Sequence, residues 1–490
     1  MKLVMSFIIK LKNTYKDMPL AAKAALWFTA CNFFVAGLGF ITGPLFTRLL
    51  PPEEYGTLTL YMTYEQIILI LATWEIQVGA YQRGLFKYEG RWDQYSLSTL
   101  VLVNLLTSAL FLVVILLFKP ISEFTKMSGL TLSLVFLYLI TNPAYFCWIT
   151  RKRTTYDYKA VVGVTVLYAL LNIVIPLLAV LNLGGTAAVK FNATLITSVL
   201  IYLFFYYKTW SSCNTKWSWD EVQPQWKYMI GFQAPLVLHS MSYLVLGQAD
   251  RIMIGKMVGD KEAAFYGVAY TLASVVTILQ SSLNQALTPW RYSKLKENNY
   301  PIVSSSTNII LILLGASILM VVLIAPELMK ILFTDDYYEA VWCIPPVSVS
   351  VFFMFLYSTF VTIESYYEKT KYIMYVSVFC GLINILLNYL LIPVFGYIVC
   401  GYTTLLSYIL FAILHFLCMK IVCDKAIPGI HIFSISKIFL ISLGLVVGSI
   451  VSTFLYNYLI VRYLIVAIMI IIALINKNKI KEIASSIRSK

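Results

Sequence analysis

Eight charged side chains interrupt or end segments that are otherwise apolar, and they are the residues best suited to chemistry. Four are acids and four are bases: Glu65, Glu75, Asp250 and Glu364, and Arg48, Lys190, Arg251 and Lys256. A charge within hydrocarbon costs about 2.5–3.5 kcal/mol on insertion scales, so such residues are expected to face a protein interior or a polar cavity. Each is therefore a candidate for ligand binding or ion coupling.

Glu65 and Glu75 are ten residues apart, which is nearly three helical turns, so one helix face can carry both. Burial favours the protonated form of a carboxylic acid, and such a group suits coupling of transport to a proton or another cation. The alternative is a static pair with Arg48, Arg83 or Arg251. The sequence leaves both interpretations open.

Arg48 and Lys256 end the first helix of each half of the chain, where they can hold a phosphate or act as interface anchors. Asp250 and Arg251 are adjacent and hence about 100° apart on a helix, which disfavours direct pairing. We expect each of them to find partners on other helices. Structural bonding between helices and substrate contact both fit that pair.

Aromatic residues make up 15% of the chain, with 35 Tyr and 29 Phe. Many Tyr and Trp residues are expected to form belts at the two membrane interfaces. Five tyrosines on the candidate cavity helices are hypothesised to stack on sugar rings: Tyr61, Tyr64, Tyr243, Tyr266 and Tyr270.

Membrane-spanning helices must position all of these residues. Hydrophobic residues make up 60% of the chain and charged residues only 12%, against roughly a quarter in soluble domains. Apolar runs of roughly 20 residues, enough to cross hydrocarbon as a helix, recur from Leu26 almost to the C-terminus. The runs are continuous, which predicts an all-α integral membrane protein and not a barrel. We expect about 14 spans: 24–49, 59–82, 97–118, 130–150, 160–181, 187–207, 229–257, 263–288, 302–324, 341–363, 372–393, 397–419, 434–456 and 459–476.

Most of the 37 Lys and Arg residues lie in the two tails and in alternate loops, which include 83–96, 151–159, 208–228 and 291–301. Loops rich in Lys and Arg stay in the cytoplasm, so these loops and both termini are predicted to be cytoplasmic. Topology therefore accounts for the formal charge of +14, and no nucleic-acid partner is expected.

The two halves of the chain carry an internal repeat with a shift of about 212 residues. LLNIVIP at 170–176 matches GLINILLN at 381–388, which pairs Asn172 with Asn384 and, further on, Gly184 with Gly396. The repeat predicts a six-helix bundle at 1–207, a cytoplasmic linker at 208–228, an equivalent bundle at 229–420, two extra helices at 434–476 and a basic cytoplasmic tail at 477–490. Two parallel bundles around a central cavity suit alternating access.

Three segments carry a resemblance to a known family: GPLFTRLLPPEEYGTLTLY at 43–61, TWEIQVGAYQRGLFKYEG at 73–90 and QADRIMIGKMVGDKEAAFYGVAY at 248–270. They resemble the Wzx oligosaccharide flippases of the MOP superfamily, which also contains MATE exporters and lipid II flippases. The resemblance implies a V-shaped, two-lobed fold in the bacterial cytoplasmic membrane. It further implies translocation of undecaprenyl-diphosphate-linked repeat units of O-antigen or capsule, with membrane lipid, a glycan polymerase and a chain-length regulator as candidate partners.

Two other functions stay open. A MATE-type exporter of cationic drugs would share the fold but should have a net acidic cavity, whereas Arg83 and Arg291 at the expected cytoplasmic entrance favour an anion. A glycan polymerase or glycosyltransferase usually needs a large outer loop, and the longest loop, 208–228, is predicted to be cytoplasmic. The sequence has no GxSxG, Walker A or HExxH motif, and its eight Cys lack zinc-ligand spacing, so no catalytic residue, cofactor or metal is expected.

Overall fold

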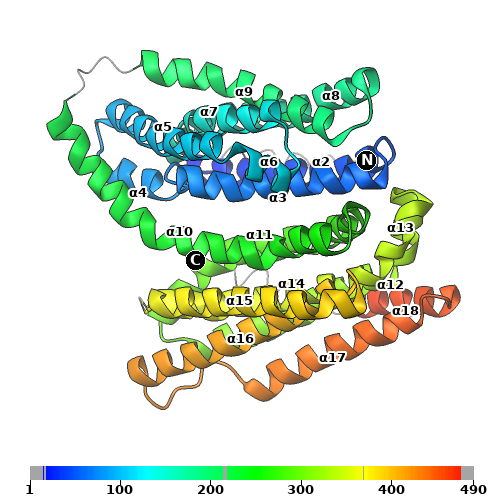
Figure 1. Ribbon diagram of the computed structural model, residues 1–490. Helices are drawn as coiled ribbons and strands as arrows, with labels where there is room; N and C mark the ends of the chain where they lie inside the picture. Colours follow the sequence, from blue (N-terminus) through cyan, green and yellow to red (C-terminus); the bar gives the residue numbers. More distant parts are fainter. Residues whose placement is uncertain (1–14, 16–17, 213–217, 368, 476–490) are drawn as a thin grey trace, which may run out of the picture. The chain divides into compact units, whose positions relative to one another are not determined.

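A computed structural model describes residue 15 and the ranges 18–212, 218–367 and 369–475. All regular structure in these ranges is helical (Figure 1), which confirms the predicted all-α membrane fold. The chain divides into two compact units. Unit 1 consists of Met1–Thr42 and Tyr61–Val237, and unit 2 of Gly43–Leu60 and Leu238–Lys490.

The helices follow one another in the order shown in Figure 1. The first half of the chain contains α2 (Leu20–Thr47), α3 (Pro52–Thr73), α4 (Ala80–Lys87), α5 (Trp92–Leu116), α6 (Phe118–Thr125), α7 (Gly129–Thr154), α8 (Tyr158–Leu183) and α9 (Ala187–Ser211). The second contains α10 (Trp219–Met257), α11 (Asp260–Lys296), α12 (Tyr300–Leu323), α13 (Ala325–Leu332), the 3-10 helix η1 (Asp335–Cys343), α14 (Ile344–Tyr366), α15 (Thr370–Phe395), α16 (Val399–Ala426), α17 (Ile435–Phe454) and α18 (Leu459–Ile475).

Twelve helices in the described ranges are long and apolar enough to cross a membrane. Two predicted spans are not among them: 59–82, which corresponds to α3 and α4, and 459–476, which corresponds to the shorter apolar α18. The total of about 14 spans therefore stays a prediction. α10 begins at Trp219, inside the predicted linker, because Asp220 and Glu221 in its first turn complement the helix dipole.

The internal repeat is visible in the helix boundaries. α8 and α15 both have 26 residues, and they end at the two glycines that the sequence pairs, Gly184 and Gly396. These glycines have φ values of +109° and +70°, a region that residues with a Cβ rarely adopt. A short helix also follows α5 in the first half and α12 in the second.

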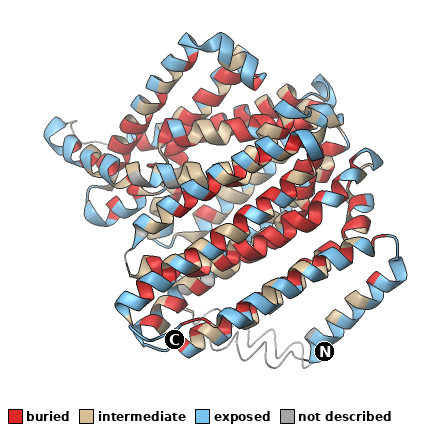
Figure 2. Cartoon of the chain, turned by 60° about the horizontal axis from the view of Figure 1, so that its bottom comes forward, coloured by how far each residue is buried: buried red, intermediate tan, exposed pale blue. Residues whose placement is uncertain are grey.

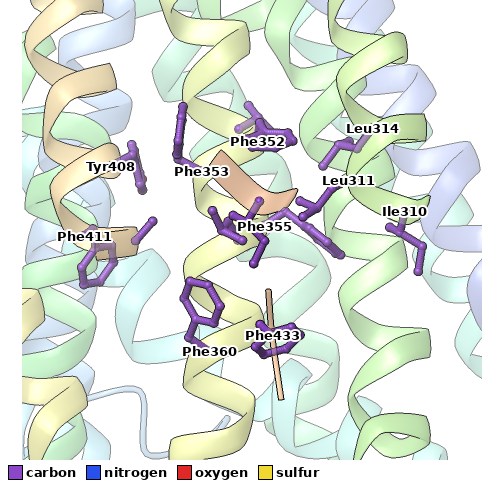
Figure 3. Packing of buried hydrophobic residues seen from close by; sticks show 14 of the residues in the cluster. Ile310, Leu311, Leu314, Phe352, Phe353, Phe355, Phe360, Tyr408, Phe411 and Phe433 are labelled. Carbon is purple, nitrogen blue, oxygen red and sulfur yellow. The ribbon is translucent and has the colours of Figure 1, made fainter. Parts of the chain in front are cut away.

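The largest apolar core lies in unit 2, where α14 packs against α11, α12 and α16. Figure 3 shows Phe352, Phe355 and Phe360 of α14 together with Leu311 and Leu314 of α12. Buried residues run along most of α14, whereas few residues of α8 and α17 are buried. The burial colours of Figure 2 show that the helices differ widely in this respect. Exposed apolar side chains are expected where helices face lipid.

The helix that follows the first span breaks between α3 and α4. Trp74 and Glu75 have φ values of +52° and +54°, in the left-handed region that ends a helix. The Gln233 side chain accepts a hydrogen bond of 3.1 Å from the backbone N–H of Ala80. It thereby supplies a partner to the N-terminus of α4. A Cβ on Gly79 would meet the end of the Gln233 side chain, so a larger residue there would displace this amide.

An ion pair between a buried arginine and a half-buried glutamate attaches α18 to the rest of unit 2. Arg462 donates to both carboxylate oxygens of Glu327 on α13, at 2.6 and 2.7 Å, and to the Leu323 carbonyl at 2.7 Å. Partial burial opposes ionisation of Glu327, yet the hydrogen bonds from the guanidinium lower the pKa of this carboxyl. A two-pronged contact of this kind is the strong form of an ion pair.

Candidate functional site: two buried carboxylate networks and a cationic pocket

The first buried network surrounds Glu65 of α3 in unit 1. Its carboxylate accepts a hydrogen bond from the Tyr138 hydroxyl of α7 and is attracted by the ammonium of Lys190 on α9. The Lys190 side chain is itself buried, with only 8% of the residue exposed. Three helices distant in sequence therefore converge on one acid and its compensating base.

Tyrosines extend this network across α7, α8 and α9. The Tyr202 hydroxyl donates to the Tyr168 hydroxyl at 2.8 Å, and the Tyr145 ring stacks on Tyr202 with centroids 4.8 Å apart. The Tyr168 and Ser198 hydroxyls lie 3.0 Å apart. Ser198 also donates to the Asn172 amide oxygen at 3.3 Å. These contacts satisfy polar groups that burial removes from water.

The second buried network surrounds Asp250 of α10 in unit 2, a residue with 0% exposure. One carboxylate oxygen accepts a hydrogen bond of 2.6 Å from the Asn388 amide on α15. The other accepts from the hydroxyls of Tyr266 on α11 and Thr404 on α16, each at 2.5 Å. All three donors are neutral. Dipoles from three other helices therefore hold this carboxylate.

More amide and hydroxyl groups surround these donors. Asn384 donates to Thr404 at 3.4 Å and lies 3.5 Å from the Asn388 amide nitrogen. Thr403 donates to the side-chain amide oxygen of Asn388. Carboxylate, amide and hydroxyl oxygens are also the ligands that hard cations prefer. The chemistry of this network thus suits a proton or a small cation.

Arg251 contacts a different set of groups from its neighbour Asp250. Its guanidinium lies over the Tyr270 ring at 4.7 Å and donates to the Gln248 side chain. Arg251 attracts Asp250 electrostatically, but the hydrogen bonds to that carboxylate come from other residues. The two neighbours thus have separate partners. Those of Asp250 lie on other helices as expected, whereas Arg251 bonds to Gln248 of its own helix and contacts only Tyr270 of α11.

Two further predicted residues are buried elsewhere in unit 2. Glu364 of α14 and His415 of α16 both have 0% exposed side chains, and Glu364 Oε1 lies 2.9 Å from His415 Nδ1. Arg291 of α11 is also fully buried, although the sequence suggested an entrance position. It donates to Thr359 at 2.9 Å and lies 5.5 Å from the Phe355 ring.

An open pocket in unit 1 combines cations with aromatic rings and has a volume of about 790 Å³. The Arg83 guanidinium lies 5.9 Å from the Phe232 ring. The Lys87 ammonium lies 4.3 Å from the Tyr228 ring. The lining of this pocket includes no acid. It can therefore contact an anionic group through its cations and an apolar sugar face through its rings.

The remaining charged candidates lie apart from these sites. Arg48 is exposed and donates to the carbonyl of Ile331, in the last turn of α13, at 2.9 Å. Such a contact compensates a helix C-terminus. Lys256 is exposed near the end of α10, and Glu75 lies half-buried in the turn after α3.

The five candidate tyrosines differ in accessibility. Tyr61, Tyr64 and Tyr266 are buried, with 6%, 4% and 0% exposure. Tyr270 is half-buried beneath the Arg251 guanidinium, and Tyr243 is exposed. In this structure the buried three act in packing and hydrogen bonding.

The sequence patterns did not predict three partners of the acids: Asn388, Thr404 and His415. Asn388 had a usable signal, because it lies four residues after Asn384 on the same helix face. Thr404 and His415 had no such sequence signal, because a single polar residue in an apolar helix does not indicate which residue of another helix it contacts.

Two protein-family models match the sequence. The model described as polysaccharide biosynthesis protein matches residues 21–296, and the MatE model matches residues 235–390. Lsg locus putative protein 1 of Haemophilus influenzae is 26% identical over 263 residues, which cover 53% of this chain and 62% of that protein. The alignment thus spans less than two thirds of this relative. An uncharacterized membrane protein of the same organism is 25% identical over 355 residues, 70% of this chain and 83% of that protein.

Solved structures share the fold. The lipid II flippase MurJ, in an inward closed conformation, has a TM-score of 0.68 and 14% identity, covering 93% of this chain and 100% of that one. The MATE transporter VcmN of Vibrio cholerae has a TM-score of 0.56 and 11% identity, covering 83% of this chain and 97% of that one. At these identities the likeness establishes the fold alone.

Proposed function

This chain belongs to the polysaccharide biosynthesis protein family, as a Wzx-type flippase of the MOP superfamily. We propose that it carries a polyprenyl-diphosphate-linked oligosaccharide repeat unit. The family model over residues 21–296 is the observation that carries this proposal. The cargo moves from the cytoplasmic to the outer leaflet of the bacterial cytoplasmic membrane. Alternating access between the bundles at 1–207 and 229–420 drives the movement.

The cationic pocket of unit 1 is the proposed site of first contact. A lipid-linked sugar presents an anionic diphosphate and a polar glycan, and both must be shielded from hydrocarbon. Arg83 and Lys87 offer charge-assisted bonds to the diphosphate, and Tyr228 and Phe232 offer rings to the sugars. With the loop 83–96 in the cytoplasm, the pocket lies on the side where the cargo is assembled.

Asp250 is the proposed coupling residue. Its carboxylate is buried among neutral donors, so binding of a proton or a small cation there would remove a net charge from the helix core. Glu65 has Lys190 as a compensating charge and is the weaker candidate. A cycle in which ion binding at Asp250 favours one access state would couple the cargo to an ion gradient.

Complementation tests the cargo and the pocket together. In a strain that lacks its own repeat-unit flippase, expression of this chain should restore surface polymer. The pair Arg83→Glu with Lys87→Glu should lower polymer about ten- to a hundredfold at equal membrane abundance, because two charge-assisted contacts are lost. Lys159→Glu reverses an exposed lysine outside the pocket and is the matched control.

Two results would redirect the proposal. Full polymer from the doubly reversed variant would remove the pocket from the pathway. Absent polymer from the unaltered chain, together with raised resistance to cationic drugs, would favour the exporter alternative that the MatE match at 235–390 supports. Co-purification of a polymerase or a chain-length regulator from the complemented strain would identify partners.

The proposed topology has a separate test. Ser212 lies at the end of α9, in a loop region that we propose to be cytoplasmic. A single Cys at this position, in a background without other Cys, should resist an impermeant thiol reagent added to intact cells and react after permeabilisation. Labelling of intact cells would reverse the topology.

A further inference from the structure

One buried acid of unit 2, Glu364 of α14, has no role in the proposed function. Its Oε1 lies 2.9 Å from Nδ1 of His415 on α16, and both side chains have 0% exposure. Two acceptor atoms do not approach each other this closely, so a proton lies between them. The pair of Glu364 and His415 is therefore a site that already holds a proton inside unit 2.

No Lys or Arg that the structure describes forms an ion pair with Glu364. Arg291 of α11 bonds instead to Thr359, which lies about 140° around α14 from Glu364. α12 contains no charged residue, and the lysines of α15 and α17 are exposed. Burial without a base favours a net-neutral pair, which carries one proton more than ionised Glu364 beside neutral His415.

Each member of the pair keeps one buried polar atom without a partner among the described residues, Oε2 of Glu364 and Nε2 of His415. A proton can add to either atom without breaking the bond between Oε1 and Nδ1. Histidine is the side chain whose charge changes most readily near neutral pH, so this pair suits reversible proton binding. Further ionisable neighbours are a phenol and two thiols: Tyr357 on α14, and Cys418 and Cys423 on α16.

One face of α16 leads from this pair to the Asp250 network. Thr404, which donates to Asp250, and His415 are eleven residues apart, which is three helical turns and about 20°. The two side chains therefore share a face of α16 and are separated by roughly 16 Å along its axis. Tyr408 lies between them on that face. Glu364 itself is in the last turn of α14, close to the end of the membrane span.

Tyr357 of α14 connects the two ends of this face. Its ring stacks on Tyr408 with centroids 6.2 Å apart and on His415 with centroids 5.8 Å apart. Tyr408 in turn interacts electrostatically with Asp250. Phenol hydroxyls both donate and accept hydrogen bonds, and water bridges gaps between such groups, so side chains of this type can pass a proton.

We propose that Glu364 and His415 load and unload the proton that Asp250 exchanges, and that Tyr357 and Tyr408 line the route between the two sites. This inference rests on the proposed coupling role of Asp250, and it identifies the coupling ion as a proton. Each transfer moves one proton: the pair returns to ionised Glu364 beside neutral His415, and the Asp250 carboxylate becomes a carboxylic acid. A metal cation at Asp250 would need no such route.

Infrared spectroscopy of the purified full-length chain tests the route without any cargo. A protonated carboxyl group has its own stretching band, and Asp250→Asn identifies the band that belongs to Asp250. After rapid acidification this band should appear at least about tenfold more slowly in His415→Gln than in the unaltered chain. Its final height should not change, because a route sets the rate of protonation and not the equilibrium. His431→Gln makes the same substitution in the exposed loop before α17 and should leave the rate unchanged.

An equal rate in His415→Gln and the unaltered chain would overturn the route. A lower final band at an unchanged rate would indicate a structural role for the pair and would also overturn it. If His415→Gln is not monodisperse, Tyr357→Phe decides, because it keeps the ring, removes the hydroxyl and should slow the band. Absence of an Asp250 band at every pH at which the chain stays folded, with stabilisation by sodium, would contradict the proton. Failed complementation beside an intact proton route would contradict the cargo alone.

Discussion

Each unit of this protein holds a carboxylate among its helices, half-buried Glu65 in unit 1 and fully buried Asp250 in unit 2, and the two units stabilise it in different ways. In unit 1, Glu65 has a buried base, Lys190, and one hydroxyl donor, Tyr138. In unit 2, Asp250 has three neutral donors from three helices. A carboxylate paired with a base forms a neutral unit, whereas one held by dipoles keeps its net charge.

From this difference we propose different roles for the two networks. Removing one member of a buried ion pair leaves an uncompensated charge, so such a pair constrains the fold but does not readily exchange a proton. A carboxylate whose hydrogen-bond donors are all neutral can gain a proton or a cation without breaking a hydrogen bond to a charged group. We therefore propose that unit 1 holds a rigid network and that unit 2 holds the group best suited to ion exchange.

The largest expected effect comes from breaking the pair in unit 1. Lys190→Met should lower the free energy of unfolding by at most about 3–5 kcal/mol, because it leaves the half-buried Glu65 without its base. The double variant Glu65→Gln with Lys190→Met should recover most of that loss, since it buries no charge. Thermal unfolding in detergent measures both. A double variant no more stable than Lys190→Met would show that the two residues do not compensate each other.

The next effect tests the proposed coupling role of Asp250 in unit 2. Asp250→Asn preserves the shape of the side chain but cannot carry the exchanged ion. Polymer production should fall about ten- to a hundredfold while membrane abundance is retained. The Glu65→Gln with Lys190→Met variant is the control and should keep most of its transport. An equal loss of polymer production in both variants would contradict the proposal that only the unit 2 carboxylate takes part in ion exchange.

The smallest effect compares one hydroxyl in each network. Tyr266→Phe removes a donor to a carboxylate that has only neutral donors, and should cost about 1.5 kcal/mol of unfolding free energy. Tyr138→Phe removes a donor to a carboxylate that still has Lys190, and should cost about 0.5 kcal/mol. Chemical denaturation of the purified variants can resolve this difference. The reverse order would indicate that Lys190 contributes little to Glu65.

The repeat and the helical fold were predictable from the sequence because their signals are local. Apolar runs of membrane length identify helices, and the paired glycines Gly184 and Gly396 end helices of equal length. Asn172 and Asn384, which the repeat pairs, both enter buried polar networks. Short-range periodicity and a constant shift are sufficient for these features.

The partners within each network were not predictable, because they depend on which face of a helix is buried. Helices in lipid are apolar on all sides, so no polar stripe distinguishes the lipid face from the core face. The donors Asn388 and Thr404 lie 138 and 154 residues from Asp250. Arg48 shows the same limit, since its contact with the Ile331 carbonyl spans 283 residues.

The ion pair between Arg462 and Glu327 has a consequence for how this protein is made. The two residues are 135 positions apart, and a ribosome adding roughly 5–20 residues per second needs about 7–27 s to pass from one to the other. α18 has only 17 residues, near the short end of the roughly 17–25 that a membrane accepts as a helix. Glu327 is therefore synthesised well before Arg462 and lacks this partner in the nascent chain. α18 can form the ion pair only after Arg462 has left the ribosome. Assembly of this region thus follows translation instead of accompanying it.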